Sequence, residues 1–241
     1  MSGHSKWATT KRAKGASDAK RAILFTKLAK TLTVAARDKG RDPTTNFSLR
    51  LAMDKAKAAN MPKENIERAI KRGTGELEGA AIEEMVYEGF GPGGVAVIVK
   101  CLTDNKNRAS QELKHLFSKY GGSLGGPGAV AWQFENKGVI RLSNDQLVNK
   151  NWEELELQLI DLGAQDIKKE EDGITIYCAI SDLQKIKKRL EDLGFNLDDA
   201  AMEYVAKEKI KVDDEARQKN QDFFDELDEN EDVDDYYTNL G

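Results

Sequence analysis

The sequence predicts an α+β protein of several domains, in which a three-helix bundle precedes two sheets and the second sheet is inserted into the first. Three observations support this prediction. Apolar residues recur at helical spacing in the first third of the chain. Beyond Gly79 the pattern changes to short runs rich in β-branched and aromatic residues. Residues 139–206 then follow the element order β-α-β-β-α-β, which is the ferredoxin-like plan.

The first helix is expected from Asp18, a good N-cap, to Gly40, a good C-cap. Its apolar residues fall within one arc and are Leu24, Leu28, Leu32 and Ala35. A second helix is indicated by the apolar residues between Leu49 and Ala59, where many alanines favour close packing. A third begins at Pro62 and ends at Gly73. Three short helices of this kind predict one small bundle.

The next segment predicts the start of a sheet. Strands at Met85–Phe90 and Val95–Leu102 flank a Gly-Pro-Gly-Gly turn, which is typical of a hairpin. A helix follows at Arg108–Tyr120, with a glycine-rich loop at 121–128 and a strand at Ala129–Phe134.

A second set of strands and helices is then expected as an insertion. Its elements are Val139–Leu142, a helix at Trp152–Leu162, Gln165–Lys168, Gly173–Ala179, a helix at Leu183–Leu193 and a strand at Met202–Ala206. An acidic helix at 214–227 and a strand at Tyr236–Leu240 return to complete the first sheet. The predicted domains are residues 1–79, residues 80–135 with 207–241, and the insert 136–206.

Charge is distributed unevenly along the 241 residues. The net charge is −5, yet residues 1–75 hold 18 Lys and Arg against 6 Asp and Glu, whereas residues 213–241 hold 12 carboxylates and 2 basic side chains. A block of this basicity attracts polyanions, of which nucleic acid is the usual one in a cytoplasm. We expect the acidic C-terminal segment either to face away from the polyanion or to compete with it for the basic residues.

The basic side chains are gathered on the predicted helices. On the first helix they occupy one arc beside the apolar stripe, and on the third they recur at i, i+3 and i+4. Lys and Arg neutralise phosphates without reading sequence, and Trp7 either stacks on a base or packs the arm onto the bundle. The alternative is a well-solvated helical surface. The predicted nucleic-acid-binding residues are Lys6, Trp7, Lys11, Arg12, Lys14, Lys20, Arg21, Lys27, Lys30, Arg68, Lys71 and Arg72.

Nucleotide binding, metal binding and catalysis find little support in the sequence. Gly89, Gly91 and Gly94 match the dinucleotide fingerprint, but a strand follows them where that motif needs a helix, so we expect a turn. Two cysteines and two histidines without close spacing predict no metal site, and His115 is expected at a solvated helix position. We therefore expect no enzymatic activity, cofactor or small-molecule substrate. Apolar runs far shorter than the roughly 20 residues of a membrane span predict a soluble, cytoplasmic protein.

Four stretches of the chain resemble the YebC/PmpR family, and the similarity extends along essentially the whole sequence. They are Gly3–Trp7, Ala58–Gly75, Tyr87–Val95 and Leu102–Arg108. This family is commonly described as transcriptional regulators, with members that bind promoter DNA. It also includes the mitochondrial translational activator of cytochrome c oxidase and ribosome-associated bacterial members that ease synthesis of proline-rich stretches.

The resemblance implies two ferredoxin-like α/β domains, one inserted in the other, and a protein without enzymatic activity. Together with the charge pattern it predicts a nucleic-acid-binding regulator of gene expression, first a DNA-binding transcriptional regulator and alternatively a ribosome- or RNA-associated translation factor. A protein–protein adaptor with a merely solvated basic face is the third hypothesis. The expected partners are promoter DNA or ribosomal RNA, with no membrane, and a monomer is favoured.

Overall fold

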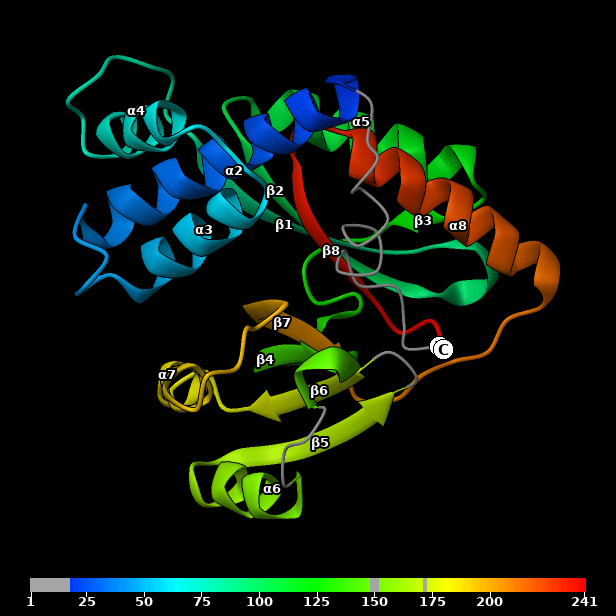
Figure 1. Ribbon diagram of the computed structural model, residues 1–241. Coiled ribbons are helices and arrows are strands. Elements are labelled where there is room, and N and C mark those ends of the chain that lie inside the picture. The colour runs from blue at the N-terminus through cyan, green and yellow to red at the C-terminus, as the bar shows by residue number, and fades with distance from the viewer. Residues whose placement is uncertain (1–17, 148–151, 171–172) are drawn as a thin grey trace. The chain divides into compact units, whose positions relative to one another are not determined.

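The computed structural model describes residues 18–147, 152–170 and 173–241, which form seven α-helices and two four-stranded antiparallel sheets (Figure 1). The predicted α+β, multidomain fold class is therefore confirmed. Residues 134–207 form one compact unit, which contains the predicted insert 136–206. The described residues before Phe134 and from Glu208 to Leu240 form the other, so the separation of the bundle from the first sheet stays a prediction.

The bundle consists of the three predicted helices, α2 (Asp18–Lys39), α3 (Phe47–Ala58) and α4 (Lys63–Gly73). Its core is mainly leucine, alanine and isoleucine, with Leu32, Leu49 and Ala56 fully buried. The buried side chain of Asn46 fixes the connection between α2 and α3. Its amide nitrogen donates to the carbonyl oxygens of Ala35 and Gly40 at 2.7 Å, and its oxygen accepts from the backbone of α3, which caps that helix.

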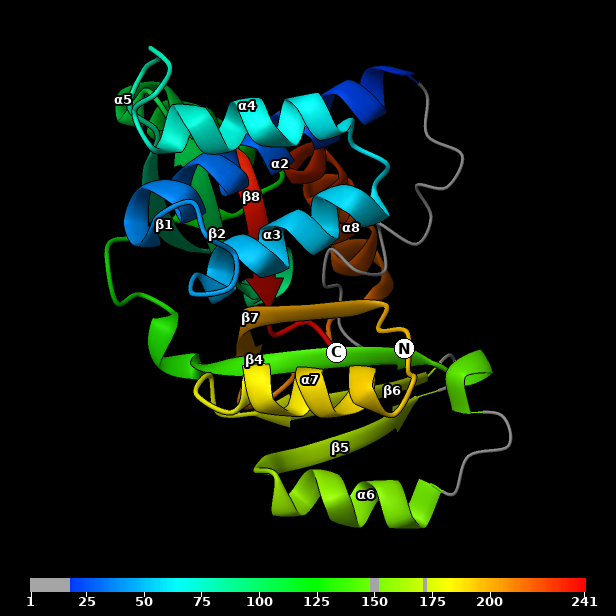
Figure 2. The same cartoon turned by 60° about the vertical axis from the view of Figure 1, so that its left-hand side comes forward.

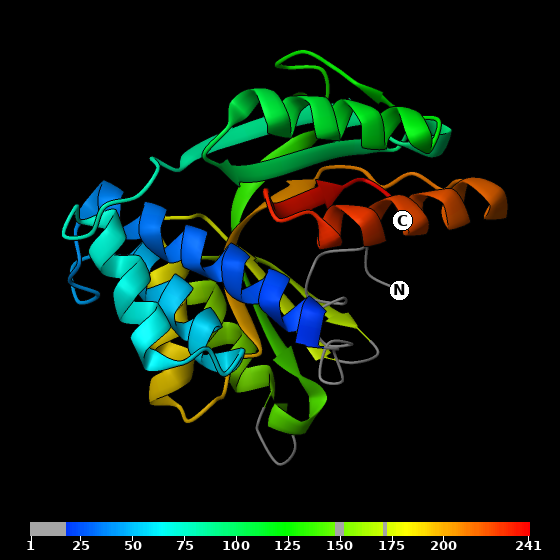
Figure 3. The ribbon, with the colours of Figure 1, turned by 90° about the horizontal axis from the view of Figure 1, so that it is seen from above.

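The first sheet lies in the same unit, with the strand order β3-β1-β2-β8. Its elements are β1 (Glu83–Phe90), β2 (Ala96–Thr103), β3 (Ser123–Leu124), β8 (Val233–Thr238) and the helices α5 (Lys106–Lys119) and α8 (Asp214–Glu229). Alternate residues from Val95, just before β2, to Cys101 pack against α5 and α8 on one face of the sheet. Figure 3 shows these elements from above. On the other face Leu102 packs against Val34 of α2, so β2 is buried on both sides.

The strand expected at Ala129–Phe134 was wrong, because of these residues only Phe134 lies in a strand, as the first residue of β4 (Phe134–Ser143). The Glu88 carboxylate accepts hydrogen bonds from the backbone nitrogens of Gly128, Val130 and Ala131 at 2.7, 2.8 and 2.7 Å. Burial would raise the pKa of Glu88, but these three hydrogen bonds hold it below its ordinary value. Residues 131–133 form a 3₁₀ turn, and the fourth strand of the sheet is instead β3, inside the glycine-rich loop.

The second sheet has the ferredoxin-like strand order β5-β6-β4-β7. Its elements are β4 (Phe134–Ser143), α6 (Trp152–Asp161), β5 (Ala164–Glu170), β6 (Gly173–Cys178), α7 (Leu183–Asp192) and β7 (Asp199–Ala206). Both helices cover one face, as Figure 2 shows. The first sheet differs in order because its two central strands, β1 and β2, are joined directly by a hairpin. No described helix is long and apolar enough to cross a membrane.

Candidate nucleic-acid interface

The predicted nucleic-acid-binding residues fall partly outside the described chain. Those on the N-terminal arm, Lys6, Trp7, Lys11, Arg12 and Lys14, lie outside the described residues. The others all belong to α2 and α4 of the bundle, and the structure divides them by their contacts into an occupied group and an exposed group.

Lys27 belongs to the occupied group, because its ammonium group closes the C-terminal end of α8. The side chain is buried, and Nζ donates to the carbonyl oxygen of Asp228 at 2.6 Å and to that of Leu227 at 3.5 Å. The last turn of α8 contains no basic residue of its own. A cation from α2 therefore meets the negative end of the α8 dipole, and it binds the carbonyl oxygen of Asp228 more closely than that of Leu227.

Lys30 is held one turn further along α2 by a buried carboxylate. Its Nζ lies 2.7 Å from Oδ1 of Asp232 and donates to the carbonyl oxygen of Glu231 at 2.9 Å. Arg108 of α5 binds Oδ2 of the same carboxylate through two nitrogens, at 2.7 and 3.1 Å. Burial would raise the pKa of Asp232, but the hydrogen bonds from Lys30 and Arg108 hold it below its ordinary value of 3.8.

These contacts change what the charge pattern of α2 indicates. On a helical wheel Lys27 and Lys30 belong to a basic face open to phosphate, whereas both ammonium groups are bound to residues 227–232. Residues of the acidic segment thus contact Lys27 and Lys30, and whether the segment faces away from a polyanion or competes with it stays a prediction. The wheel could not show this, because the partners lie about 200 positions away in the sequence.

Lys20 and Arg21 form an exposed basic pair on the first turn of α2. Lys20 makes one solvent-exposed ion pair, with Glu229 at 3.3 Å. Arg21 is exposed and makes no ion pair with any residue that the structure describes. An exposed pair such as that of Lys20 contributes about 0–1 kcal/mol, so a phosphate could replace Glu229 at little cost.

The C-terminal half of α4 carries the second exposed group, Arg68, Lys71 and Arg72, here called the α4 basic cluster. The opposite face of α4 packs on α2, with Ile66 and Ala69 buried. At Gly73 the backbones of α4 and α2 lie close together, since a Cβ atom there would lie 2.2 Å from the carbonyl oxygen of Thr33. Because the opposite face of α4 is buried against α2, the α4 basic cluster faces solvent.

Of the glycines that match the dinucleotide fingerprint, Gly89 lies in β1, and Gly91 and Gly94 belong to the hairpin turn that was predicted. Residues 92–94 make a 3₁₀ turn between β1 and β2, and Asn220 of α8 donates to the carbonyl oxygen of Pro92 at 2.9 Å. A Cβ atom on Gly91 would lie 2.7 Å from Oδ1 of Asn220. Glycine is needed here for close packing against α8.

Catalytic and metal chemistry gain no support from the part of the chain that the structure describes. It holds no cluster of three or more residues suited to a metal ion. Cys101 and Cys178 are buried free thiols, and burial raises the pKa of Cys101 to about 12 and that of Cys178 to about 11. Thiols with such pKa values are poor nucleophiles at neutral pH. His115 is exposed on α5, as expected.

Comparison with known proteins places the whole chain in one family. Residues 5–76 match the model of the TACO1/YebC protein N-terminal domain, and residues 82–240 match that of the TACO1/YebC second and third domain. A protein of Thermotoga maritima named "probable transcriptional regulatory protein" is 51% identical over 240 residues, covering 100% of this chain and 94% of its own.

Two further relatives agree over nearly the same length. A protein of Dehalococcoides mccartyi, also named as a probable transcriptional regulatory protein, is 49% identical and is matched over 97% of this chain and 92% of its own. The crystal structure of a conserved hypothetical protein from Aquifex aeolicus aligns with a TM-score of 0.84 at 42% identity, covering 93% of this chain and 91% of that one. From the matched domain models and from this identity along its full length, the chain belongs to the TACO1/YebC family.

Proposed function

We propose that this protein is a non-enzymatic regulator of gene expression that binds nucleic acid, with promoter DNA as its target. The names of its relatives as probable transcriptional regulatory proteins support a regulatory role. The charge distribution supports a polyanionic ligand, since residues 1–75 carry three times as many basic as acidic side chains.

The observation that carries the proposal is the exposure of the α4 basic cluster. Arg68 and Arg72 are exposed and make no ion pair with any described residue, while Lys71 stands between them on the same face. Three positive side chains within two turns raise the local potential and favour phosphate groups. Two basic residues in the last turn also suit the helix dipole, but that role does not require Arg68, which lies a turn earlier.

A second contact region is the start of α2. Lys20 and Arg21 lie next to the basic arm, so Lys6, Lys11, Arg12 and Lys14 extend the same positive charge along the sequence. The turn of α2 beside Gly73 is that of Thr33 and Ala36. At 1.5 Å per residue, Ala36 lies about 24 Å along the helix from Lys20, so the two regions contact separate phosphates.

Lys27 and Lys30 take a different part in this proposal. Their ammonium groups hold the bundle to α8 and to the turn before β8, so they orient the phosphate-binding surface without contacting the nucleic acid. Reversing their charge would break that contact and would confuse loss of binding with loss of structure.

The test is therefore a charge reversal confined to exposed residues. We would change Arg21, Arg68, Lys71 and Arg72 to Glu and measure the affinity for duplex DNA at several salt concentrations. Affinity should fall, and the slope of log K against log salt should shrink by about 0.9 for each lost phosphate contact. The matched control reverses the same number of exposed lysines elsewhere: Lys114, Lys185, Lys188 and Lys209. An equal loss of DNA affinity in the control would contradict the proposed surface. If the protein is instead a protein–protein adaptor, neither set of substitutions should impair its activity.

The target is identified by cross-linking in intact cells and sequencing of the recovered nucleic acid, with the reversed variant as control. Enrichment of particular promoters supports the transcriptional function. Recovery of ribosomal RNA at one discrete site would instead identify a translation factor, whose affinity for DNA follows from charge alone.

A further inference from the structure

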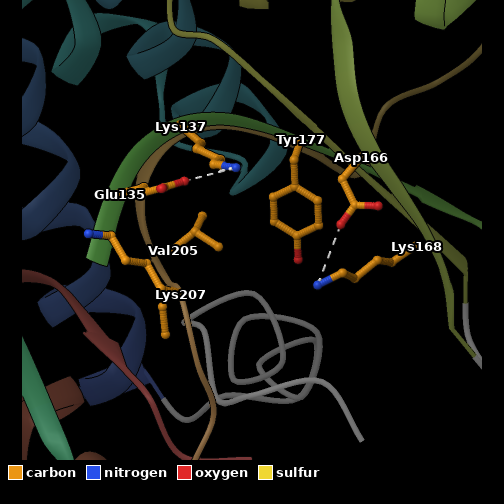
Figure 4. Close-up of a pocket in the computed structure, with 8 residues that line it drawn as sticks. Glu135, Lys137, Asp166, Lys168, Tyr177, Val205 and Lys207 are labelled. Carbon is orange, nitrogen blue, oxygen red and sulfur yellow. Dashed lines mark ion pairs between the residues drawn. The ribbon is translucent and has the colours of Figure 1, made fainter. Parts of the chain in front are cut away.

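The sheet of the inserted unit carries a shallow hollow on the face opposite α6 and α7. Its volume is about 230 Å³, and all its lining residues belong to β4, β5, β6, β7 or the residue directly after β7. The polar side chains around it are Glu135, Lys137, Asp166, Lys168, Tyr177 and Lys207, as Figure 4 shows. None of these residues was singled out by the sequence patterns.

Tyr177 presents its ring in the middle of this hollow. It lies on β6, opposite Val139 of β4 and Asp166 of β5, and the ring is partly exposed. The ammonium group of Lys168 stands 5.2 Å from the ring centroid, within the range of a cation–π contact. Burial raises the pKa of Tyr177 to about 12, so the phenol remains neutral at physiological pH.

The sheet beneath the ring is held rigidly. Arg141 of β4 and Glu203 of β7 form a two-point ion pair at 2.5 and 2.8 Å, and both residues are buried. Because the sheet beneath it is rigid, the ring of Tyr177 loses little conformational freedom when a planar ligand stacks on it.

The charged side chains that line the hollow are three lysines and two carboxylates. Lys137 pairs with Glu135 at 3.1 Å and Lys168 with Asp166 at 3.6 Å, and Lys207 adds a third cation, so the charged lining has a small positive excess. The two carboxylates can accept hydrogen bonds from the edge of a base. Anionic groups are favoured near the ammonium groups of the lysines.

We propose that this face binds single-stranded nucleic acid by stacking one base on Tyr177, with the flanking phosphates near Lys168 and Lys207. The cavity is smaller than the roughly 300–1,000 Å³ of pockets for drug-sized molecules, and it matches a single planar group. In one class of RNA-binding domain, aromatic rings on the strands of a four-stranded sheet stack two or three bases, and such stacking tolerates any base sequence. This inference rests on the proposed function only for the class of ligand, nucleic acid. The site itself is separate, because it does not lie in the compact unit that contains the α4 basic cluster.

The test uses the full chain and a fluorescein-labelled single-stranded oligonucleotide of about eight nucleotides, a length within the usual site sizes. Tyr177→Ala should weaken its binding roughly 5- to 150-fold, the loss expected for one stacked base. Tyr177→Phe should retain wild-type affinity because the ring remains. Lys168→Ala should weaken binding, whereas the matched control Lys188→Ala, on exposed α7, should not. Thermal unfolding of each variant checks that the fold is intact, and the comparison of Lys168→Ala with Lys188→Ala keeps the test valid where Tyr177→Ala unfolds.

Several outcomes would overturn the inference: no binding of the oligonucleotide by the wild type, equal affinity in wild type and a folded Tyr177→Ala, or an equal loss in Tyr177→Phe. A parallel loss of duplex binding in Tyr177→Ala would also count against it, since a duplex offers no unstacked base. Failure of the proposed function looks different. In that case the reversal at Arg21, Arg68, Lys71 and Arg72 leaves duplex binding unchanged, while the Tyr177-dependent binding of the single strand persists.

Discussion

The buried carboxylate of Asp232 offers the sharpest test of how the bundle is held to the first sheet. Its Oδ1 accepts from Lys30 of α2 and its Oδ2 from Arg108 of α5. In Asp232→Asn one of these oxygens becomes an amide group that can only donate. Whichever way the amide is turned, a donor then faces a cation, and the negative charge that both cations share is gone.

The size of the effect follows from the partners that remain. Removing one member of a buried ion pair costs about 3–5 kcal/mol when the other is left alone. Here Lys30 keeps the carbonyl oxygen of Glu231 at 2.9 Å, and the half-exposed Arg108 keeps Asp104 at 3.0 Å. We therefore expect a loss of about 2–3 kcal/mol in the free energy of unfolding. At about 2–4 °C per kcal/mol for a chain of this size, the melting temperature should fall by about 4–12 °C.

The measurement is chemical and thermal unfolding followed by circular dichroism. The matched control is Glu229→Gln, which removes an exposed carboxylate from Lys20 at 3.3 Å and should cost less than about 1 kcal/mol. Lys30→Met completes a double-mutant cycle with Asp232→Asn, and we expect a coupling energy of about 1–3 kcal/mol. If Asp232→Asn costs no more than Glu229→Gln, or the cycle shows no coupling, the account of this contact is refuted.

Acid should erase the difference between wild type and Asp232→Asn. Because the folded-state pKa of Asp232 lies below 3.8, the carboxylate adds stability above pH 3.8, and this contribution is lost as the pH falls through the lower folded value. The two unfolding free energies should be furthest apart near neutral pH and converge in strong acid. A gap that persists there would show that the substitution acts through packing instead of charge.

Two further substitutions test the turns around the first sheet. Gly91→Ala should destabilise the protein by about 1–3 kcal/mol, because the added Cβ would lie 2.7 Å from Oδ1 of Asn220; an unchanged denaturation midpoint would contradict this close packing. Glu88→Gln should cost about 1–3 kcal/mol, because an amide cannot accept all the hydrogen bonds that the carboxylate receives from residues 128–131. Hydrogen exchange should accelerate at those backbone amides, and unchanged protection would argue against the role assigned to Glu88.

Local patterns were sufficient for most elements. The helices α2, α3 and α4 follow the apolar spacing, and the hairpin of β1 and β2 follows the Gly-Pro-Gly-Gly turn, since both are decided by residues a few positions apart. The strand expected at Ala129–Phe134 did not form because the backbone nitrogens of Val130 and Ala131 donate to Glu88, some 40 positions earlier, instead of to a neighbouring strand. Three hydrogen bonds to a buried carboxylate outweigh a modest strand preference.

The candidate site divides in the same way. The position of Arg68, Lys71 and Arg72 on one exposed face follows from helical geometry and the apolar residues opposite them. The sequence pattern does not single out Tyr177, because a lone aromatic residue in a strand indicates a core position. Its proposed role depends on residues of β4, β5 and β7, which are brought near it only by the pairing of the strands in the sheet.

The sequence by itself determined the helical bundle, the ferredoxin-like order of the insert, the excess of positive charge in the first third and the family. Only the tertiary structure decided which of those charges face solvent. Lys27 and Lys30 are indistinguishable from Lys20 on a helical wheel, yet their ammonium groups are bound to residues 227–232, about 200 positions away. Helix periodicity is set within a few residues, whereas the partner of a charged side chain is set by where the folded chain returns.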